Sequence, residues 1–234
     1  HRPYKRLAGW GNVKRNDIVV FNFPAGDTVA LENINSTYYD IVRSYISDYG
    51  DERTAMAMLE KEKTIIYRPV DKREHYVKRC VAIPGDTVLF QNSQLYINGS
   101  KQEEFDGREY EYIVRTNGTP ISRSVLESMG LSKEDVAYYQ ASATYTMPLT
   151  DANLSRVQSM ANVISVEKVE IDYLDHNIFP NDDRYQWSVD NFGPLWVPKK
   201  GATVQLTTET LPLYHRIIKN YEGNELKVDS DTIY

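Results

Sequence analysis

The sequence predicts a mostly β fold that carries an inserted lobe of mixed helix and strand. Short runs rich in β-branched and aromatic residues alternate with Pro, Gly, Asn and Asp, which is typical of strands and turns. The 18 tyrosines outnumber the six phenylalanines. Tyrosine suits a half-exposed strand, because its ring can be buried while its hydroxyl stays in water. A charged segment with helical patterns interrupts these strands between about 99 and 196, where we place the lobe.

The first strand is expected at 17–23, where nearly every residue is apolar. Such a run is typical of a strand that is covered on both faces. Apolar residues at helical spacing then predict a helix over 36–49, with a capping hydroxyl before it and a glycine after it. A second helix is expected at 51–63, which is rich in Ala, Met, Leu, Glu and Lys.

Later elements follow from the same signals. Further strands are expected at 64–67, 76–83, 87–90, 95–97, 163–173, 202–206 and 226–228. Helices are expected at 124–130, 132–139, 151–160 and 213–221. Asn98-Gly99 favours a hairpin turn, and 175–200 is expected to be irregular. These elements divide into the first part of a β core at 1–98, an inserted α+β lobe at 99–196, and a truncated return toward the core at 197–234.

Composition excludes several classes of protein. The net charge is −6, so no basic excess is present to bind nucleic acid. One cysteine, Cys80, allows no internal disulfide, and the four histidines lack metal-ligand spacing, so we expect no metal and no cofactor. No apolar run reaches the roughly 18 residues of a membrane-spanning helix. Because the chain begins at His1 and ends on a strand-like run, we expect it to be a fragment of a longer protein.

The run 76–86 carries the most chemical information. With a period of two, Tyr76, Lys78 and Cys80 share one strand face, which is apolar except for the lysine. Burial disfavours an ammonium group, and a lysine whose pKa is lowered in this way is a competent general base for a serine. Two simpler interpretations stay open: Lys78 reaches solvent, or it pairs with a carboxylate. Cys80 is expected to be a small apolar filler.

Two segments carry a resemblance to a known family. The run 76–86, Lys-Arg followed by Ile-Pro-Gly-Asp, closely resembles the lysine box of bacterial type I signal peptidases. Residues 14–21 resemble the strand box that precedes it, which is usually Arg-Gly-Asp followed by apolar residues; here Asn16 replaces the glycine. Residues 95–99 fit the hairpin that follows. The long connection between the boxes and the run 190–198 resemble the larger Bacteroides-type enzymes.

The resemblance implies a signal-peptidase-like β core, incomplete here, and a membrane-anchored serine endopeptidase with a Ser–Lys dyad. Such an enzyme cuts signal peptides from exported pre-proteins on the outer, periplasmic face of the cytoplasmic membrane, with its anchor outside this chain. Lys78 would be the general base. The residues that would support the site are Arg79, Asp86 and Asp17. The residues that would line the groove, with the peptide added as an extra strand, are Tyr76, Val77 and Val20.

Two family boxes are missing from the sequence. No serine precedes Lys14, so the nucleophile is absent, and we expect this chain alone to be inactive. The last box, Gly-Asp-Asn-Arg followed by Ser-x-Asp-Ser-Arg, is mimicked weakly at 181–190, which we interpret as a polar loop; the real box is expected beyond Tyr234. The alternatives are a self-cleaving, repressor-type protease and a non-catalytic homologue that binds peptides or partners.

Overall fold

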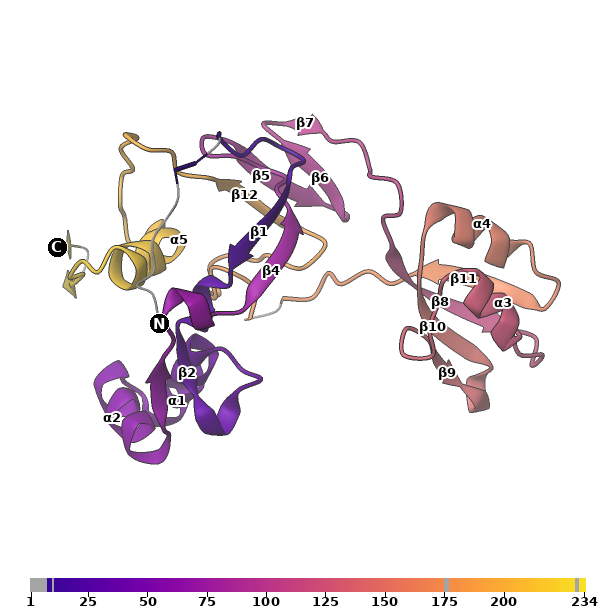
Figure 1. The fold of residues 1–234 in the computed structure, drawn as a ribbon, viewed down its shortest axis with the longest axis horizontal. Helices are drawn as coiled ribbons and strands as arrows, with labels where there is room; N and C mark the ends of the chain where they lie inside the picture. Colours follow the sequence, from indigo (N-terminus) through magenta and orange to yellow (C-terminus); the bar gives the residue numbers. More distant parts are fainter. Residues whose placement is uncertain (1–7, 10, 175–176, 230–231) are drawn as a thin grey trace. The chain divides into compact units, whose positions relative to one another are not determined.

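The structure, a computed structural model, describes residues 8–9, 11–174, 177–229 and 232–234 (Figure 1). Strands in antiparallel sheets dominate and helices are few, which confirms the mostly β prediction. The chain divides into two compact units. The first comprises 1–88, 179–184 and 196–234, and the second comprises 89–178 and 185–195. The lobe boundaries at 98/99 and 196/197 stay predictions.

The described residues of the first unit contain three antiparallel strand pairs and a helical hairpin. Its strands are β1 (Ile18–Asn22), β2 (Thr28–Ala30), β3 (Ile65–Tyr67), β4 (His75–Arg79), β13 (Val228–Asp229) and β14 (Thr232–Ile233). Its helices are α1 (Tyr38–Tyr49), α2 (Glu52–Glu62) and α5 (Leu211–Arg216), which continues as a π-helical turn at Ile217–Tyr221. Short 3-10 turns lie at Pro24–Gly26, Leu31–Asn33 and Val70–Lys72. The pairs are β1–β4, β2–β3 and β13–β14.

Capping explains why α1 begins and ends where it does. The Thr37 hydroxyl accepts a hydrogen bond from the Asp40 amide at 3.2 Å, and Gly50 ends the helix with a left-handed φ of 85°. The buried side of α1 and α2 packs on the β2–β3 pair around Ala30, Ile41 and Leu59. Both helices were predicted, and both are confirmed.

The prediction that the first strand is covered on both faces is wrong. Ile18 is 60% exposed and Val20 is 67% exposed in β1, and Val77 of β4 is 60% exposed. The reason is that β1 and β4 form a sheet of two strands, and a two-stranded ribbon has too few neighbours to bury either face. β4 also ends at Arg79, four residues before the predicted end of its strand.

The second unit holds two four-stranded sheets. The first sheet has the order β12 (Phe192–Trp196), β5 (Thr87–Gln91), β6 (Gln94–Ile97), β7 (Ser100–Lys101), with β5 and β12 each crossing the boundary between the units. The second has the order β11 (Val163–Lys168), β8 (Tyr110–Thr116), β10 (Thr144–Leu149), β9 (Ala137–Tyr139). The remaining elements are α3 (Arg123–Ser128), α4 (Asp151–Gln158) and a 3-10 turn at Gln140–Ser142.

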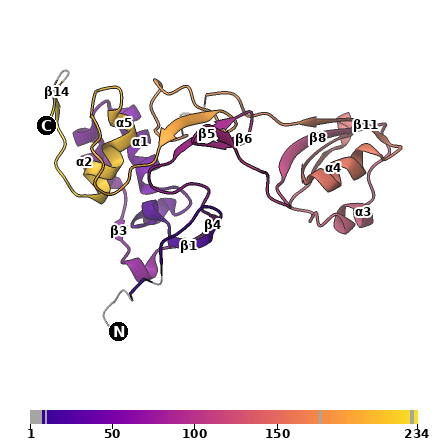
Figure 2. The ribbon, with the colours of Figure 1, turned by 90° about the horizontal axis from the view of Figure 1, so that it is seen from above.

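Helices α3 and α4 lie on one face of the second sheet (Figure 2). Alternate residues of β8 and β10 point into this core, where Val114, Met147 and Leu149 are at most 1% exposed. Val157 of α4 is likewise fully buried against them. This layer of helices on a sheet is a self-contained core of the second unit.

Several predicted elements are corrected by pairing with distant residues. The helix expected at 132–139 is a turn followed by β9, because Tyr138 pairs with β10 and stacks on Tyr145 with ring centroids 4.3 Å apart. The irregular region at 175–200 contains β12, whose Pro194 is accommodated at the edge of its sheet. The strand expected at 202–206 is irregular. The strands β8 and β10 were not predicted.

Candidate functional site

The two strands that bear the family boxes lie side by side as β1 and β4. In their antiparallel register Val19 is opposite Lys78, Val20 is opposite Val77, and Phe21 is opposite Tyr76. Opposite residues share a face, and neighbours along a strand alternate between faces. One face therefore presents Lys78 and Tyr76 with Val19 and Phe21, and the other presents Val20 and Val77.

The expectation that Lys78 is buried is wrong for this structure. Every residue of β4 is exposed, Lys78 included. In the described part of the chain only β1 pairs with β4, so little covers the Lys78 face. The residue opposite Lys78 on that face is half-buried Val19, and Tyr76 stacks on Phe23 with ring centroids 4.8 Å apart.

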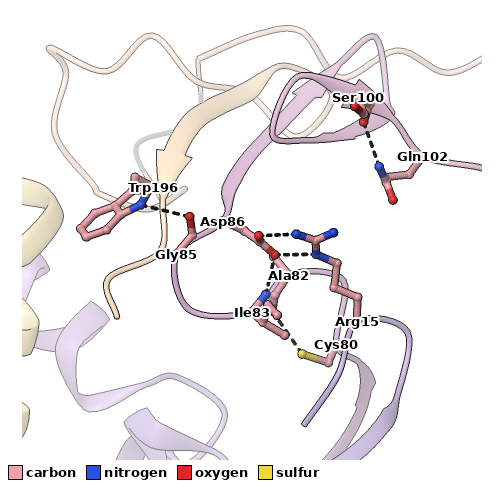
Figure 3. A network of polar contacts seen from close by, with 9 residues as sticks. All are labelled: Arg15, Cys80, Ala82, Ile83, Gly85, Asp86, Ser100, Gln102 and Trp196. Carbon is pink, nitrogen blue, oxygen red and sulfur yellow. Dashed lines mark hydrogen bonds and ion pairs between the residues drawn. The ribbon is translucent and has the colours of Figure 1, made fainter. Parts of the chain in front are cut away.

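Asp86 ties the turn after the lysine box to the segment before β1. Arg15 Nε donates to Asp86 Oδ2 at 2.7 Å, and Arg15 Nη2 donates to Asp86 Oδ1 at 2.5 Å (Figure 3). Asp86 is 4% exposed and also accepts the Ile83 amide at 2.9 Å. A two-pronged guanidinium–carboxylate pair fixes distance and orientation together. Asp86 thus joins the turn at 83–86 to Arg15, a partner that no local signal in the sequence indicates; its role in supporting a catalytic site stays a prediction.

Asn16 adopts the conformation for which the family's glycine is suited. Its φ is +73°, in the left-handed region, and the Asp17 amide donates to the Lys14 carbonyl at 3.3 Å across the turn. Asn is one of the few residues other than glycine that visit this region at small cost. The Asp17 carboxylate accepts the Lys14 amide at 2.8 Å, which closes the turn from the other side.

The same turn meets the end of β4. The Asn16 amide donates to the Cys80 carbonyl at 2.7 Å, and the Cys80 amide donates to the Asp17 carbonyl at 2.8 Å. Arg79 Nη1 donates to the Asn16 carbonyl at 3.0 Å, so Arg79 holds this turn. The half-buried Cys80 thiol donates to the Ala82 carbonyl at 3.2 Å (Figure 3).

The Pro-Gly-Asp turn has a further partner from late in the chain. Trp196 Nε1 donates to the Gly85 carbonyl at 3.2 Å (Figure 3). The Gly85 amide donates to the Val197 carbonyl at 2.7 Å, and the Val197 amide donates to the Asp86 carbonyl at 2.8 Å. Gly85 has a φ of +99°, which only glycine adopts readily. No local signal in the sequence indicates these contacts, because Trp196 is 111 residues away.

The segment 181–190, the weak mimic of the last family box, is divided between the two units. Ser188 is 2% exposed, and its hydroxyl donates to Asp172 at 3.3 Å. Asp190 accepts the Ile171 amide at 2.6 Å and the Ser93 hydroxyl at 2.5 Å. Both side chains are therefore occupied in holding the second unit together.

The described residues contain neither a metal-binding cluster nor a membrane-spanning helix. In the ranges that the structure describes, no group of three or more His, Cys, Asp or Glu side chains is arranged to hold a metal ion. Within the same ranges, no helix combines the length and the apolar character needed to cross a membrane. His1 and His176 lie outside the described residues.

The joined boxes define a chain of the signal-peptidase type, and comparison with known proteins agrees. The sequence profile of the family "Signal peptidase, peptidase S26" matches residues 4–163, so the chain belongs to that family. It is 40% identical over 74 residues to signal peptidase I of Bacillus amyloliquefaciens, a match that covers 32% of this chain and 34% of that protein. It is 44% identical over 77 residues to signal peptidase IB of Staphylococcus aureus strain N315, covering 33% and 38% respectively.

These matches are partial. The chain spans between 34% and 38% of the length of these two relatives. No solved structure gives a significant match to this chain.

Proposed function

We propose that the protein to which this chain belongs is a serine endopeptidase that removes signal peptides from exported pre-proteins, with Lys78 as the general base of a Ser–Lys dyad. The observation that carries the proposal is the Arg15–Asp86 pair, because it joins the two family boxes around the strand that bears Lys78. Family membership over 4–163 supports the reaction class. A purely binding homologue or a self-cleaving repressor-type protease is not favoured by this membership.

The proposed chemistry requires an uncharged amine. Lys78 shares its face with Val19, Phe21 and Tyr76, which offer little to stabilise an ammonium ion once water is removed. We propose that the bound peptide and further parts of the protein cover this face. The neutral amine then takes the proton of a serine hydroxyl as the serine attacks the peptide carbonyl. Lys78 gives this proton to the amine nitrogen as the peptide C–N bond breaks, so the carboxyl-terminal product leaves and an acyl-enzyme remains. Water then attacks the acyl carbonyl, its proton passes through Lys78 to the serine oxygen, and the signal peptide is released.

The proposed groove lies along β4. In the described part of the chain, β4 pairs with β1 along one edge, and its other edge carries no strand. Backbone donors and acceptors on such an edge bind an extended peptide as an additional strand. Tyr76 and Val77 would flank the peptide on opposite faces, and Val20 lies opposite Val77 to form the wall of a shallow apolar pocket.

Two parts of the proposed enzyme are assigned outside residues 1–234. One is the serine nucleophile, since residues 1–13 contain no serine. The other is a membrane anchor that holds the catalytic domain on the outer face of the cytoplasmic membrane. A general base without its nucleophile performs no acyl transfer, so we propose that the isolated chain is inactive.

The whole protein tests the assignment of Lys78. Cleavage of a purified pre-protein by the full-length protein should fall by about 10²–10⁴-fold in the variant Lys78→Ala, because a general base supplies acceleration of that order. Lys72→Ala, which removes an exposed cation close to β4, should leave the rate unchanged. Equal rates for Lys78→Ala and the unmodified protein would refute the assignment.

The isolated chain tests the assignment of the nucleophile. Residues 1–234 incubated with the same pre-protein should yield no mature product. Clean processing by this chain that disappears in Lys78→Ala would show that a nucleophile lies within these residues.

A further inference from the structure

A pocket of about 390 Å³ lies within the first unit, away from β1 and β4. It is formed by α1, the segment 179–184 and the helix α5 with its π-helical continuation. Its apolar wall consists of Val42, Ile46, Phe179, Pro180, Leu211 and Pro212. Its basic side chains are Arg43, Arg184, His215, Arg216 and Lys219. The volume lies in the range of pockets that bind small ligands, roughly 300–1,000 Å³.

Side-chain contacts hold these elements around the pocket. Lys219 Nζ lies 2.7 Å from Glu52 Oε1 of α2. The Arg216 guanidinium lies over the Tyr39 ring of α1 at 5.1 Å. Arg184 Nη1 donates to the Thr208 carbonyl at 2.6 Å, which anchors the segment 179–184 beside the start of α5.

The charges in the pocket do not balance. Three of its cations have carboxylate partners: Arg43 pairs with Asp40, Arg184 with Asp182, and Lys219 with Glu52. Arg216 has none among the described residues; it contacts Tyr39 and donates to the Asn181 amide oxygen at 3.5 Å. A chain with a net charge of −6 thus concentrates a surplus positive charge beside an apolar wall.

Two further features mark the same place. The α5 helix changes at Ile217 into a π-helical turn that brings Lys219 and Asn220 to the pocket wall. π-helical turns are rare in proteins, and those that occur often lie at functional sites. In addition, burial lowers the pKa of His215, and the charges of Lys219 and Arg216 lower it further against the opposing effect of Glu52. The pocket therefore holds crowded positive charge that an anion would relieve.

We propose that this pocket binds a small amphipathic carboxylate, with the carboxylate on Arg216 and an apolar chain against the wall of Val42, Ile46 and Leu211. Arg216 presents a planar fork of donors that suits a carboxylate. This inference goes beyond the proposed peptidase function and is independent of it, because it uses neither Lys78 nor the β1–β4 pair.

Calorimetric titration of the 234-residue chain tests the proposal. Decanoate should bind, whereas decanol, with the same chain and no charge, should bind at least about tenfold more weakly. The variant Arg216→Gln should weaken decanoate binding at least about tenfold, and Arg53→Gln, which removes an exposed arginine of α2 outside the pocket, should leave it unchanged. Equal binding of decanoate and decanol, or equal binding by Arg216→Gln and the unmodified chain, would overturn the proposal.

The same titrations distinguish two sources of this chemistry. In a second pair of titrations, acetylated trileucine with a free C-terminal carboxylate is compared with the same peptide as its C-terminal amide. If the peptide carboxylate binds more tightly than decanoate, the natural ligand is a peptide end. If decanoate binds more tightly, the natural ligand is a fatty acid. Absence of binding by both carboxylates would refute the site.

A second measurement uses only the unmodified chain, so it does not require that a variant folds. In the unmodified chain, the His215 pKa followed by NMR should rise when decanoate binds and stay constant with decanol. A His215 pKa that decanoate does not move would contradict placement of the carboxylate beside Arg216.

Discussion

Arg15 and Asp86 lie 71 residues apart in the chain and form a two-pronged ion pair, with donor–acceptor distances of 2.7 and 2.5 Å. Asp86 is almost fully buried, whereas the Arg15 side chain is 41% exposed. Asp86 also accepts the Ile83 amide, so its carboxylate ties the turn at 83–86 to Arg15.

Asp86→Ala is therefore expected to loosen this turn. It removes the acceptor of the Ile83 amide, and a buried donor without a partner costs about 1–3 kcal/mol. Hydrogen exchange measured by NMR should show the Ile83 amide exchanging at least about tenfold faster in the variant. Asp71→Ala, an exposed carboxylate of the same unit, is the matched control. Unchanged protection of Ile83 in Asp86→Ala would contradict the role of the pair.

Asn16 should tolerate glycine better than alanine. At a φ of +73° a Cβ without a hydrogen-bonding side chain costs about 1–2 kcal/mol, so Asn16→Ala should unfold at lower urea concentration, and Asn16→Gly should stay close to the unmodified chain. Asn12→Ala, at an exposed asparagine that lacks a positive φ, should have no effect. If Asn16→Ala and Asn12→Ala unfold at the same urea midpoint, the turn does not require the left-handed conformation.

Ser93 and Lys168 form a Ser–Lys contact away from Lys78, and we expect it to be structural. Lys168 Nζ donates to Ser93 Oγ at 2.9 Å, while the Ser93 hydroxyl donates to Asp190 at 2.5 Å. Ser93 is 5% exposed, so neither its proton nor its oxygen is available to a substrate. A fluorophosphonate probe should therefore leave Ser93 unmodified, as measured by mass spectrometry of the treated chain.

The same contact should matter for stability. Ser93→Ala removes the hydroxyl that bridges Lys168 and Asp190, and the expected cost to the second unit is about 1–3 kcal/mol in urea unfolding. Ser100→Ala, at an exposed serine of the neighbouring strand β7, should be neutral. Labelling of Ser93 together with unchanged stability of Ser93→Ala would argue for a reactive serine instead.

His215 should make the first unit sensitive to mild acid. Its pKa in the folded chain is lowered below 6.5 by burial and by Lys219 and Arg216. The unfolded chain then binds more protons below about pH 6.5, so stability falls as the pH falls through 6.5 toward the folded pKa and levels off below it. His215→Asn should reduce the loss of stability between pH 7.5 and 5.5, measured as the shift in urea midpoint.

The Asp182–Arg184 ion pair of the same unit is separated from this window. Arg184 lowers the pKa of Asp182 below 3.8, so the stability that this pair contributes is present above 3.8 and is lost only as the pH falls further. His75→Asn, at an exposed histidine, is the matched control. The same acid sensitivity in His215→Asn and the unmodified chain would contradict the assignment to His215.

Local signals in the sequence determined the helices α1 and α2 and the mostly β character. A helix is stabilised by residues three and four apart and by caps such as Thr37 and Gly50, so its signal lies in a short window. The two family boxes could also be identified from the sequence, because each box is a contiguous run of residues. Lys78 was assigned as the general base on this resemblance, and that role stays a prediction.

Only the tertiary structure decided which distant residues contact these two boxes. It paired Arg15 with Asp86, brought Trp196 to Gly85, turned 137–139 into a strand against β10, and left Lys78 on the exposed face of a two-stranded ribbon. The physical reason is that burial and partner choice depend on how many neighbours a residue gains from distant parts of the chain. Periodicity identifies the face on which a side chain lies, but not what covers that face.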